Sequence, residues 1–591
     1  MSMHIDKAEL ISKLQTLEGL TNDERSSLIG LLREHKKYGL VWEDKPEDVE
    51  ERLREELPVL REVKNKAILS DEPEAPNHIL IEGDNLEALT ALSYTHEGKI
   101  DVIYIDPPYN TGNKDFVYND SFVDTEDSYR HSKWLSFMNK RLKIAKKLLS
   151  DKGVIFISID DNEQANLKLL CDEVFGSRNF VSILVWKSKS GGANDSSAFG
   201  VDHEYILSYS SKIENLRLNN DKQATVTTSY NKVDESGRRY SLDRLDKQSL
   251  GYLASLDFPI IGPDGKEYIV EHKDPNNKKA RWRWGQDTVK ERYDELVFIY
   301  PYVYTKNYEK EDGQKPRSIL FDERFGRTRT GSTDLASVIG KQSIFSYPKP
   351  VSLLKFITDI SSKQSSIILD FFAGSGTTLH ATMQLNAEDG GHRQCILVTN
   401  NENNICEEVT YERNKRVING YTTPKGVEVP GLKQNTLRYY KTDYISRDRT
   451  QKNMRDLVAA ATDLLCIKED LYEEQKTFGR FKLKPQLARY FDNGKRHMLI
   501  IYREELIDEI AEEIKKLDFG GKRLKIYVFS PGRYPFTDNF REVEDKVELV
   551  ALPAAIYDAY QKVLPKRKEK LFEEEQTQEA TKIPSDLFEG E

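Results

Sequence analysis

Two stretches of the chain alternate short runs of Ile, Val and Leu with helix-forming patterns, and a long irregular segment separates them. The predicted strands are 79–81, 101–105, 153–159, 367–369 and 395–398. The predicted helices are 85–94, 134–149, 162–174 and one that begins at Thr378. Strands that alternate with helices in this way are typical of a largely parallel, doubly wound sheet. We therefore predict one α/β sheet whose halves, 71–186 and 343–420, are interrupted by the segment 187–342.

Smaller regions flank the predicted sheet on both sides. Residues 1–70 read as helices, with a helix start at 22–25 and a second helix over 47–66, and we expect them to serve packing or dimerisation. After the sheet we predict a connecting helical segment (421–475), a small α/β domain (476–565) and a charged tail (566–591). In the small domain the predicted strands are 498–502, 524–529 and 547–552, with an amphipathic helix over 504–517.

Length and cysteine usage narrow the class of protein. With 591 residues the chain needs more than one hydrophobic core. No apolar run has membrane-spanning length, and the N-terminus lacks the apolar core of a signal peptide. The four cysteines lie far apart and form no C-x-x-C pair; they are Cys171, Cys395, Cys406 and Cys466. We expect reduced core thiols in a cytoplasmic protein that has no membrane attachment and no metal site.

The formal net charge of −10 does not exclude binding to nucleic acid, because only the contacting face needs to be positive. Part of the acidity lies in 47–56 and 573–591, segments that need not touch DNA. The interrupting segment carries slightly more basic than acidic residues.

The run Asp106-Pro107-Pro108-Tyr109 directly follows the predicted strand 101–105. In open α/β sheets ligands bind beyond the carboxyl ends of the strands, so this loop has the position of an active site. The exocyclic nitrogen of adenine is a weak nucleophile, and two acceptors against its N–H bonds would free its lone pair for attack. The Asp106 carboxylate and the Pro107 carbonyl are suitable acceptors, held in place by the prolines. Tyr109 offers a face for stacking a flipped base. By itself such a run is more often an ordinary proline turn after a strand than a catalytic loop.

A second motif, residues 367–378, reads as a strand, a glycine-rich turn and the start of a helix. Such a turn lets a cofactor approach the backbone closely. It lacks the lysine of a phosphate-binding P-loop and the third glycine of the dinucleotide fingerprint, which disfavours ATP and NAD. Glu402, after the next strand, is placed to bind ribose hydroxyls.

Together the two motifs resemble those of the β class of DNA amino-methyltransferases, in which the catalytic motif precedes the cofactor motif. The resemblance covers roughly residues 78–420. It implies a Rossmann-like class I methyltransferase fold, S-adenosylmethionine as cofactor and adenine N6 as target, since cytosine-N4 enzymes more often carry serine at the position of Asp106. The predicted catalytic residues are Asp106, Pro107, Pro108 and Tyr109. The predicted cofactor-binding residues are Asp84, Asn85, Lys349, Asp370, Phe372, Gly374, Ser375, Gly376, Thr377 and Glu402.

Three runs, 104–112, 280–285 and 370–381, also resemble the modification subunit of type III restriction systems. This resemblance implies that 187–342 is a target-recognition domain for double-stranded DNA. It further implies a homodimer and a separate helicase–nuclease restriction subunit. The chain itself contains no Walker A or helicase motif, so restriction would need that partner.

Arginines in the interrupting segment are the candidates for DNA contact, because arginine reads guanine bidentately or binds phosphate. They are Arg281, Arg283, Arg324, Arg327 and Arg329. The alternative is that the neighbouring Trp282 and Trp284 are core residues and the arginines are solvated.

The prediction is therefore a site-specific DNA methyltransferase acting on adenine N6 by base flipping. One alternative within the same chemistry is methylation of cytosine N4 or of RNA. An alternative of another class is a DNA-recognition subunit that delivers a helicase–nuclease partner and whose own methylation is secondary or lost.

Overall fold

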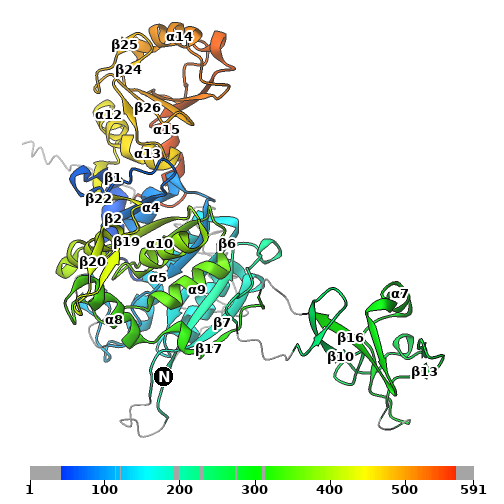
Figure 1. Ribbon diagram of the computed structural model, residues 1–591. Helices are drawn as coiled ribbons and strands as arrows, with labels where there is room; N and C mark the ends of the chain where they lie inside the picture. Colours follow the sequence, from blue (N-terminus) through cyan, green and yellow to red (C-terminus); the bar gives the residue numbers. More distant parts are fainter. Residues whose placement is uncertain are drawn as a thin grey trace, which may run out of the picture. The chain divides into compact units, whose positions relative to one another are not determined.

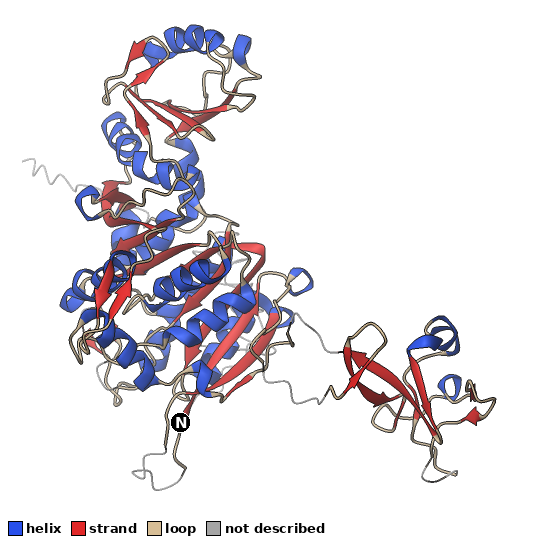
Figure 2. Ribbon diagram, in the orientation of Figure 1, coloured by secondary structure: helices blue, strands red, loops and turns tan. Residues whose placement is uncertain are grey.

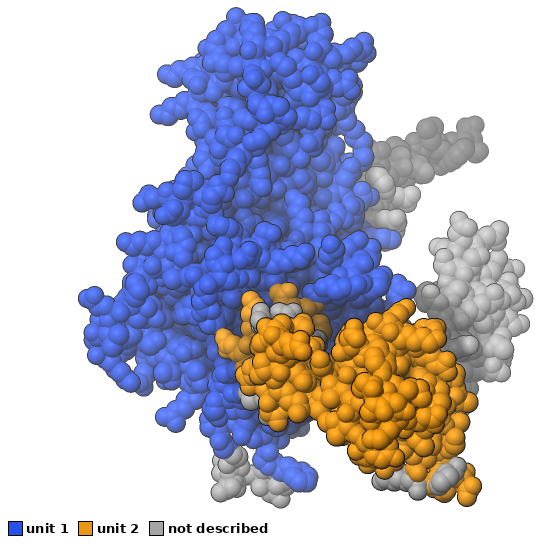
Figure 3. Space-filling view, turned by 45° about the vertical axis from the view of Figure 1, so that its right-hand side comes forward, with its two compact units in different colours: residues 1–217, 318–591 blue, residues 218–317 orange. Residues whose placement is uncertain are grey.

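The computed structural model describes residues 42–112, 115–119, 121–191, 199–224, 230–272, 274, 276–308 and 313–567. The helix start predicted at 22–25 and the tail beyond residue 567 lie outside these ranges. The chain divides into two compact units, residues 1–217 with 318–591 and residues 218–317 (Figure 3).

A ten-stranded sheet forms the centre of the larger unit (Figure 1, Figure 2). In spatial order its strands are β1 (Glu56–Glu62), β22 (Thr436–Ser446), β2 (Asn77–Glu82), β19 (Gln394–Thr399), β18 (Ile367–Asp370), β3 (Ile100–Ile105), β6 (Leu149–Ile159), β8 (His203–Ser210), β7 (Phe180–Lys187) and β17 (Ile319–Leu320). Neighbours from β22 to β6 are all parallel, whereas β8 is antiparallel to β6 and β7. The predicted α/β class with a largely parallel sheet is confirmed, and each predicted strand of this sheet is present.

Residues that alternate along the central strands enter two hydrophobic cores, one on each face of the sheet. In β3, Ile103 and Ile105 pack into the first core, whereas Val102 and Tyr104 pack into the second. The first core includes α4 (Asn85–Thr95), α5 (Arg130–Leu148) and α6 (Gln164–Cys171), and the second includes α9 (Val351–Ser361), α10 (Thr377–Asp389) and α11 (Glu412–Asn419). Burial on both faces explains why these strands are almost continuously apolar.

The strand order reverses between β3 and β18, which are neighbours in the middle of the sheet. After β3 the chain continues to β6 on one side, and after β18 it continues to β19 on the other. Ligands of open α/β sheets bind outside the carboxyl ends of the strands at such a reversal. Asp106 directly follows β3, and Asp370 is the last residue of β18. The two predicted motifs therefore begin at adjacent positions on the functional edge of the sheet.

Two predicted helical regions are wrong in part, because strands at the sheet edge replace them. The helix predicted over 47–66 ends early: α3 (Asp48–Glu55) gives way to β1, where Pro58 cannot donate a helical hydrogen bond. The connecting segment predicted as helical over 421–475 begins with a hairpin of β20 (Gly420–Thr422) and β21 (Glu428–Pro430), followed by β22, which lies between β1 and β2. Only its later part is helical, as α12 (Gln451–Ala460) and α13 (Thr462–Glu469).

The C-terminal region has a five-stranded sheet of its own. Its order is β23 (Glu474–Gln475), β26 (Ala488–Asp492), β27 (His497–Ile501), β28 (Leu524–Phe529) and β29 (Val547–Leu552). The last three correspond to the predicted strands, and α14 (Ile507–Lys516) lies within the predicted helix. The final helix, α15 (Ala554–Gln561), packs against α4 of the larger sheet.

The smaller unit, residues 218–317, is shorter than the predicted target-recognition segment 187–342. The difference arises because β8 inserts into the main sheet and α8 (Thr328–Ile339) packs against α11. The unit contains an antiparallel sheet of β15 (Leu296–Ile299), β16 (Tyr302–Tyr308), β10 (Arg239–Arg244) and β9 (Lys232–Val233). Near its two ends the chain is clasped by paired backbone hydrogen bonds between Asp221 and Gln314, with N···O distances of 2.7 and 3.1 Å.

All four cysteines are free and buried, as expected of core thiols. Among the residues that the structure describes, no helix combines the length and the apolar content that a bilayer crossing requires.

Candidate active site

The loop after β3 is held by hydrogen bonds at Pro108 and at Asn110. The carbonyl of Pro108 accepts a hydrogen bond from the indole Nε1 of Trp134, at 2.7 Å. Asn110 adopts a positive φ of 58°, and its Nδ2 donates to Glu163 Oε1 at 2.5 Å. Glu163 is fully buried and also lies 2.6 Å from His131 Nδ1. These contacts fix the loop, while the carbonyl of Pro107 receives no hydrogen bond from any residue described.

Asp106 and Tyr109 form one cluster with two charged residues that come from distant parts of the chain. Lys349 Nζ lies 2.8 and 2.7 Å from the two carboxylate oxygens of Asp106, and 3.0 Å from the hydroxyl of Tyr109. The Tyr109 hydroxyl is 3.0 Å from Asp106 Oδ1 and 3.0 Å from Glu204 Oε2. Glu204 Oε2 in turn lies 3.5 Å from Lys349 Nζ. The cluster therefore contains two carboxylates, one ammonium and one phenol.

Charge, not burial, decides the protonation of Lys349 in this cluster. Burial alone lowers the pKa of its ammonium, but the Asp106 and Glu204 carboxylates outweigh that effect and raise the pKa above its usual value. Burial and the same two carboxylates raise the pKa of the Tyr109 hydroxyl well above 10. Lys349 is therefore a cation and Tyr109 a neutral hydrogen-bonding group throughout the physiological range.

The glycine-rich turn between β18 and α10 requires glycine at two positions. Gly374 and Gly376 have φ values of 48° and 72°. A Cβ at Gly374 would lie 2.9 Å from Cζ of Phe345, which shows how closely the segment before Lys349 approaches this turn. A Cβ at Gly376 would lie 2.4 Å from Nδ2 of Asn414. Side chains are therefore excluded from the turn by packing as well as by backbone conformation.

Asp370 is buried at the base of this turn and holds it by two hydrogen bonds. Its Oδ1 accepts from the backbone N–H of Phe372 at 3.0 Å, and its Oδ2 from the Thr378 hydroxyl at 2.5 Å. Burial raises its pKa to about 7, and the negative charge of Asp106 contributes in the same direction. The two predicted motifs are thus close enough to interact electrostatically.

The turn at Asp84 and Asn85 is joined directly to the glycine-rich turn. Asn85 Nδ2 donates to the carbonyl of Phe371 at 3.1 Å, and Asp84 caps α4 by accepting from the N–H of Leu86. Arg141, fully buried in α5, donates to Asn85 Oδ1 at 2.5 Å and lies 3.6 Å from Asp84. The structure therefore brings together the segments that the sequence predicted to bind one cofactor.

Some predicted cofactor residues have other partners. The hydroxyls of Ser375 and Thr377 are buried and accept hydrogen bonds from Nη1 of Arg413, at 3.1 and 2.7 Å. Their side chains support the turn from inside. Glu402 is exposed in a short helical turn after β19, and its role as ribose ligand stays a prediction. Lys349, predicted among the cofactor ligands, contacts the catalytic loop, and its role toward the cofactor stays a prediction.

Sequence reasoning missed four charged residues that hold the site: Arg141, Glu163, Glu204 and Arg413. Each contacts a motif only through tertiary structure. The local sequence offered no signal: Arg141, for example, lies between Lys140 and Leu142 in a lysine-rich stretch and is distinguished only by its burial.

The arginines predicted to contact DNA are divided by the structure. Arg327 is 3% exposed and donates to the carbonyls of Phe321, Asp322 and Gly326, so it is withdrawn as a DNA contact. Arg283 pairs with Asp243 at 3.2 Å, and Arg324 lies 3.8 Å from Asp322. These placements leave Arg281 and Arg329 as the stronger candidates.

Trp282 is a core residue of the smaller unit and donates to the carbonyl of Phe258, which is the alternative considered for it. Arg281 is half-buried beside it, and Arg329 is exposed on α8 of the larger unit. Contact of these two arginines with DNA stays a prediction.

A largely parallel sheet that carries a glycine-rich turn and the Asp106 loop at adjacent strand ends defines an α/β protein with a ligand-binding site where the strand order reverses. Residues 100–419, more than half of the chain, match the model of a DNA methylase family. The chain belongs to this DNA methylase family, which includes enzymes that modify amino groups of bases.

Similar curated proteins come from restriction–modification systems. The chain is 34% identical over 384 residues to the type III restriction-modification enzyme EcoPI Mod subunit of Escherichia phage P1, a match of 56% of this chain and 59% of that protein. It is 35% identical to the StyLTI Mod subunit of Salmonella typhimurium, over 55% of this chain and 52% of that one. It is 36% identical to the type II methyltransferase M.KpnI of Klebsiella pneumoniae, over 58% of this chain and 84% of that protein.

The chain thus spans about half to six-tenths of the length of the two type III subunits. These matches confirm the resemblance inferred from the two motifs.

Proposed function

We propose that this protein transfers a methyl group from S-adenosylmethionine to the N6 amino group of adenine in double-stranded DNA. The observation that carries the proposal is the adjacency of Asp106, after β3, and the glycine-rich turn, after β18, at the reversal point of the sheet. Family membership supports the reaction class. The aspartate in the catalytic loop favours adenine over cytosine. The sheet and its strand order are those expected of a Rossmann-like class I methyltransferase.

The residues present suit S-adenosylmethionine. Its sulfonium and ammonium groups are cationic, and the buried Asp370 carboxyl stands at the base of a turn from which side chains are excluded. Aromatic rings of Phe372 and Phe345 border the same turn and suit the apolar parts of the molecule. Asp370 and Asn85 would hold it, with the backbone of Gly374. When bound, this cofactor supplies an electrophilic methyl group.

The catalytic loop then prepares the amino group for attack. Asp106 accepts one N–H of the amino group, and the carbonyl of Pro107 accepts the other. Asp106 is held by Lys349 and Tyr109, and the loop that carries Pro107 is held at Pro108 and Asn110, so little reorganisation accompanies the reaction. Once the new N–C bond forms, the nitrogen carries an extra proton, and Asp106 is the carboxylate placed to take it. The base must leave the duplex to reach this loop, and Tyr109 offers a ring against which it can stack.

The same comparisons support a place in a type III-like system. We propose that the smaller unit, 218–317, recognises the target sequence, with Arg281 as a contact. A restriction partner is part of this proposal, motivated by the Mod subunits of type III restriction-modification enzymes that the chain matches. The homodimer and the helicase–nuclease nature of the partner rest on the resemblance of the sequence runs alone. The alternatives are a recognition subunit whose methylation is secondary, and a cytosine-N4 methyltransferase.

The identity of the product tests the proposal. Purified protein is incubated with plasmid DNA and labelled S-adenosylmethionine, and the DNA is then digested to nucleosides. We expect label in N6-methyldeoxyadenosine and only on plasmids that contain a particular short sequence. Label in N4-methyldeoxycytidine would overturn the adenine assignment. DNA binding and partner capture without any label would favour the recognition subunit.

Affinity for the cofactor should depend on pH through Asp370. Since its pKa is about 7, the free protein holds this carboxyl partly protonated at neutral pH, and binding of a cationic cofactor requires the carboxylate. Affinity therefore rises as pH increases through 7, by about tenfold between pH 6 and pH 8. Calorimetric titration with S-adenosylmethionine at both values measures this change. Asp370→Asn should bind weakly and show no such dependence; an equal pH response in that variant would contradict the assignment.

A further inference from the structure

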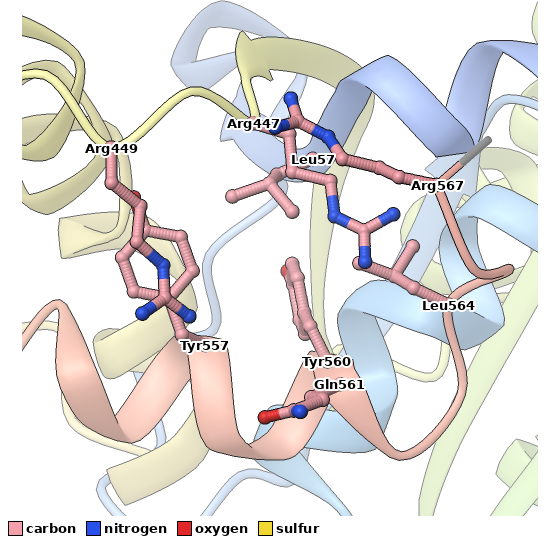
Figure 4. Close-up of a pocket in the computed structure, with 8 residues that line it drawn as sticks. All are labelled: Leu57, Arg447, Arg449, Tyr557, Tyr560, Gln561, Leu564 and Arg567. Atoms are coloured by element: carbon pink, nitrogen blue, oxygen red, sulfur yellow. The ribbon is translucent and has the colours of Figure 1, made fainter. Parts of the chain in front are cut away.

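A cavity of about 430 Å³ lies where β1, the segment after β22 and α15 meet (Figure 4). None of the residues that line it belongs to the candidate active site. Figure 4 shows Arg449 with Tyr557 on one side, and Arg447 with Arg567 on the other. Its volume is within the range of small-molecule sites, which is about 300–1,000 Å³.

The cavity carries positive charge that nearby carboxylates do not balance. Arg567 is paired, with Asp448 at 2.8 Å and Glu55 at 3.6 Å. Arg447 and Arg449 have no carboxylate within ion-pair distance among the residues described. Nη1 of Arg447 is held by three neutral backbone carbonyls, those of Leu53, Arg54 and Pro565. Burial, followed by the like charge of Arg567, lowers the pKa of Arg447, and the opposing effect of Glu55 does not outweigh them.

A second, independent feature of the cavity is an unused hydroxyl. Tyr557 is 8% exposed, and its hydroxyl has no hydrogen-bond partner among the described residues. The guanidinium carbon of Arg449 lies 4.5 Å from the centre of its ring. By contrast, the neighbouring Tyr560 hydroxyl donates to the carbonyl of Pro58 at 2.6 Å. A buried polar group without a partner costs stability unless a ligand supplies one.

The remaining walls are apolar apart from the side chain of Gln561. Leu57 and Leu564 line the cavity together with the ring of Tyr560. Arginine is suited to phosphate because its planar fork matches two oxygens at once. Aromatic and aliphatic walls beside arginines suit the flat ring of a base. An inorganic anion would use the arginines but leave these walls without a function.

We propose that this cavity binds a nucleotide, with its phosphate between Arg447 and Arg449, a hydrogen bond from the Tyr557 hydroxyl, and its base against the apolar walls. The nucleotide is either a free nucleoside phosphate or the phosphorylated end of a DNA strand; both present the same group. The site is separate from methyl transfer and does not depend on the function proposed above.

The first test is calorimetric titration of the full chain with ADP, with S-adenosylhomocysteine in excess so that ADP cannot enter the proposed cofactor site. Tyr557→Phe removes only the unused hydroxyl and should weaken binding about tenfold while leaving the melting temperature unchanged or higher. Arg449→Ala, which changes an exposed side chain, should weaken binding by about tenfold or more.

Matched controls exist for both variants. The Tyr440 hydroxyl is also buried without a described partner, but it does not line the cavity, so Tyr440→Phe should bind as the unchanged protein does. Arg455 is an exposed arginine of α12 outside the cavity, and Arg455→Ala should likewise bind normally.

The second test distinguishes the two sources of the phosphate. Binding of a short duplex with 5′-phosphate ends is compared with that of the same duplex with 5′-hydroxyl ends. A preference for the phosphorylated ends that Tyr557→Phe and Arg449→Ala abolish identifies DNA ends as the ligand, and ADP binding that they weaken identifies a free nucleotide. The proposal is overturned if neither probe binds, or if both variants bind as tightly as the controls.

Discussion

Asp106→Ala is expected to lose on the order of 10³-fold or more of the DNA methylation rate while its affinity for S-adenosylmethionine is retained. The described hydrogen bonds of the Asp106 carboxylate are with Lys349 and Tyr109, and none is with the glycine-rich turn. Its loss therefore removes an acceptor for the amino group and leaves the cofactor turn intact. Single-turnover transfer of labelled methyl groups measures the rate, and calorimetry measures cofactor affinity.

Two companion variants make this result specific. Asp106→Asn keeps the size of the side chain but not its charge, and should be almost as inactive as Asp106→Ala. Asp151→Ala removes an exposed carboxylate on β6 that pairs with Lys212, and should methylate normally. Sequence-dependent methylation that persists in Asp106→Ala would refute the mechanism.

Lys349→Met is expected to lower methylation roughly 10²-fold. Without the ammonium, the Asp106 and Glu204 carboxylates lie on either side of the Tyr109 hydroxyl with no cation between them. Their mutual repulsion then displaces Asp106 from the position in which it accepts from the amino group. Single-turnover transfer of labelled methyl groups measures the loss.

The conservative variant separates this positioning role from a merely structural one. Lys349→Arg keeps the charge between the two carboxylates and should recover most of the rate, whereas a loss caused by packing alone would persist in it. Lys355→Met changes a lysine of α9 that pairs with Glu388 and should behave as the unchanged protein does. A normal rate in Lys349→Met would show that the lysine does not position Asp106.

Strands that are buried on both faces could be predicted from the sequence, whereas strands at the edge of the sheet could not. The central strands, such as β3 and β6, are buried on both faces, and their continuous apolar runs identify them. β1 and β22 were not identified, because they pair with each other although they lie far apart in the sequence. The local sequence pattern does not show which distant segment a strand pairs with. Because the residues before β1 do form a helix, the predicted helix was extended too far.

The same distinction applies to the site. Asp106 and the glycine-rich turn each lie in an unbroken run of motif residues, so the sequence alone predicts their chemistry. Glu204 and Arg413 act on those motifs across the fold, at 3.0 Å from Tyr109 and 2.7 Å from Thr377. Lys349 was predicted as a cofactor-binding residue, and that role stays a prediction; its contact with Asp106 was not predicted, because sequence order does not show that its segment reaches the catalytic loop.

The paired backbone hydrogen bonds between Asp221 and Gln314 bear on how the smaller unit could be exchanged while the methylation site stays the same. Because this bridge joins the segments by which the chain enters and leaves the smaller unit, the residues between 221 and 314 are an insert whose two ends are neighbours. An insert of different length or sequence, spliced at the same two positions, leaves β8, β17 and every residue around Asp106 untouched. If the smaller unit recognises the target as proposed above, recombination at these positions changes the recognised sequence and leaves the residues of the methylation site unaltered.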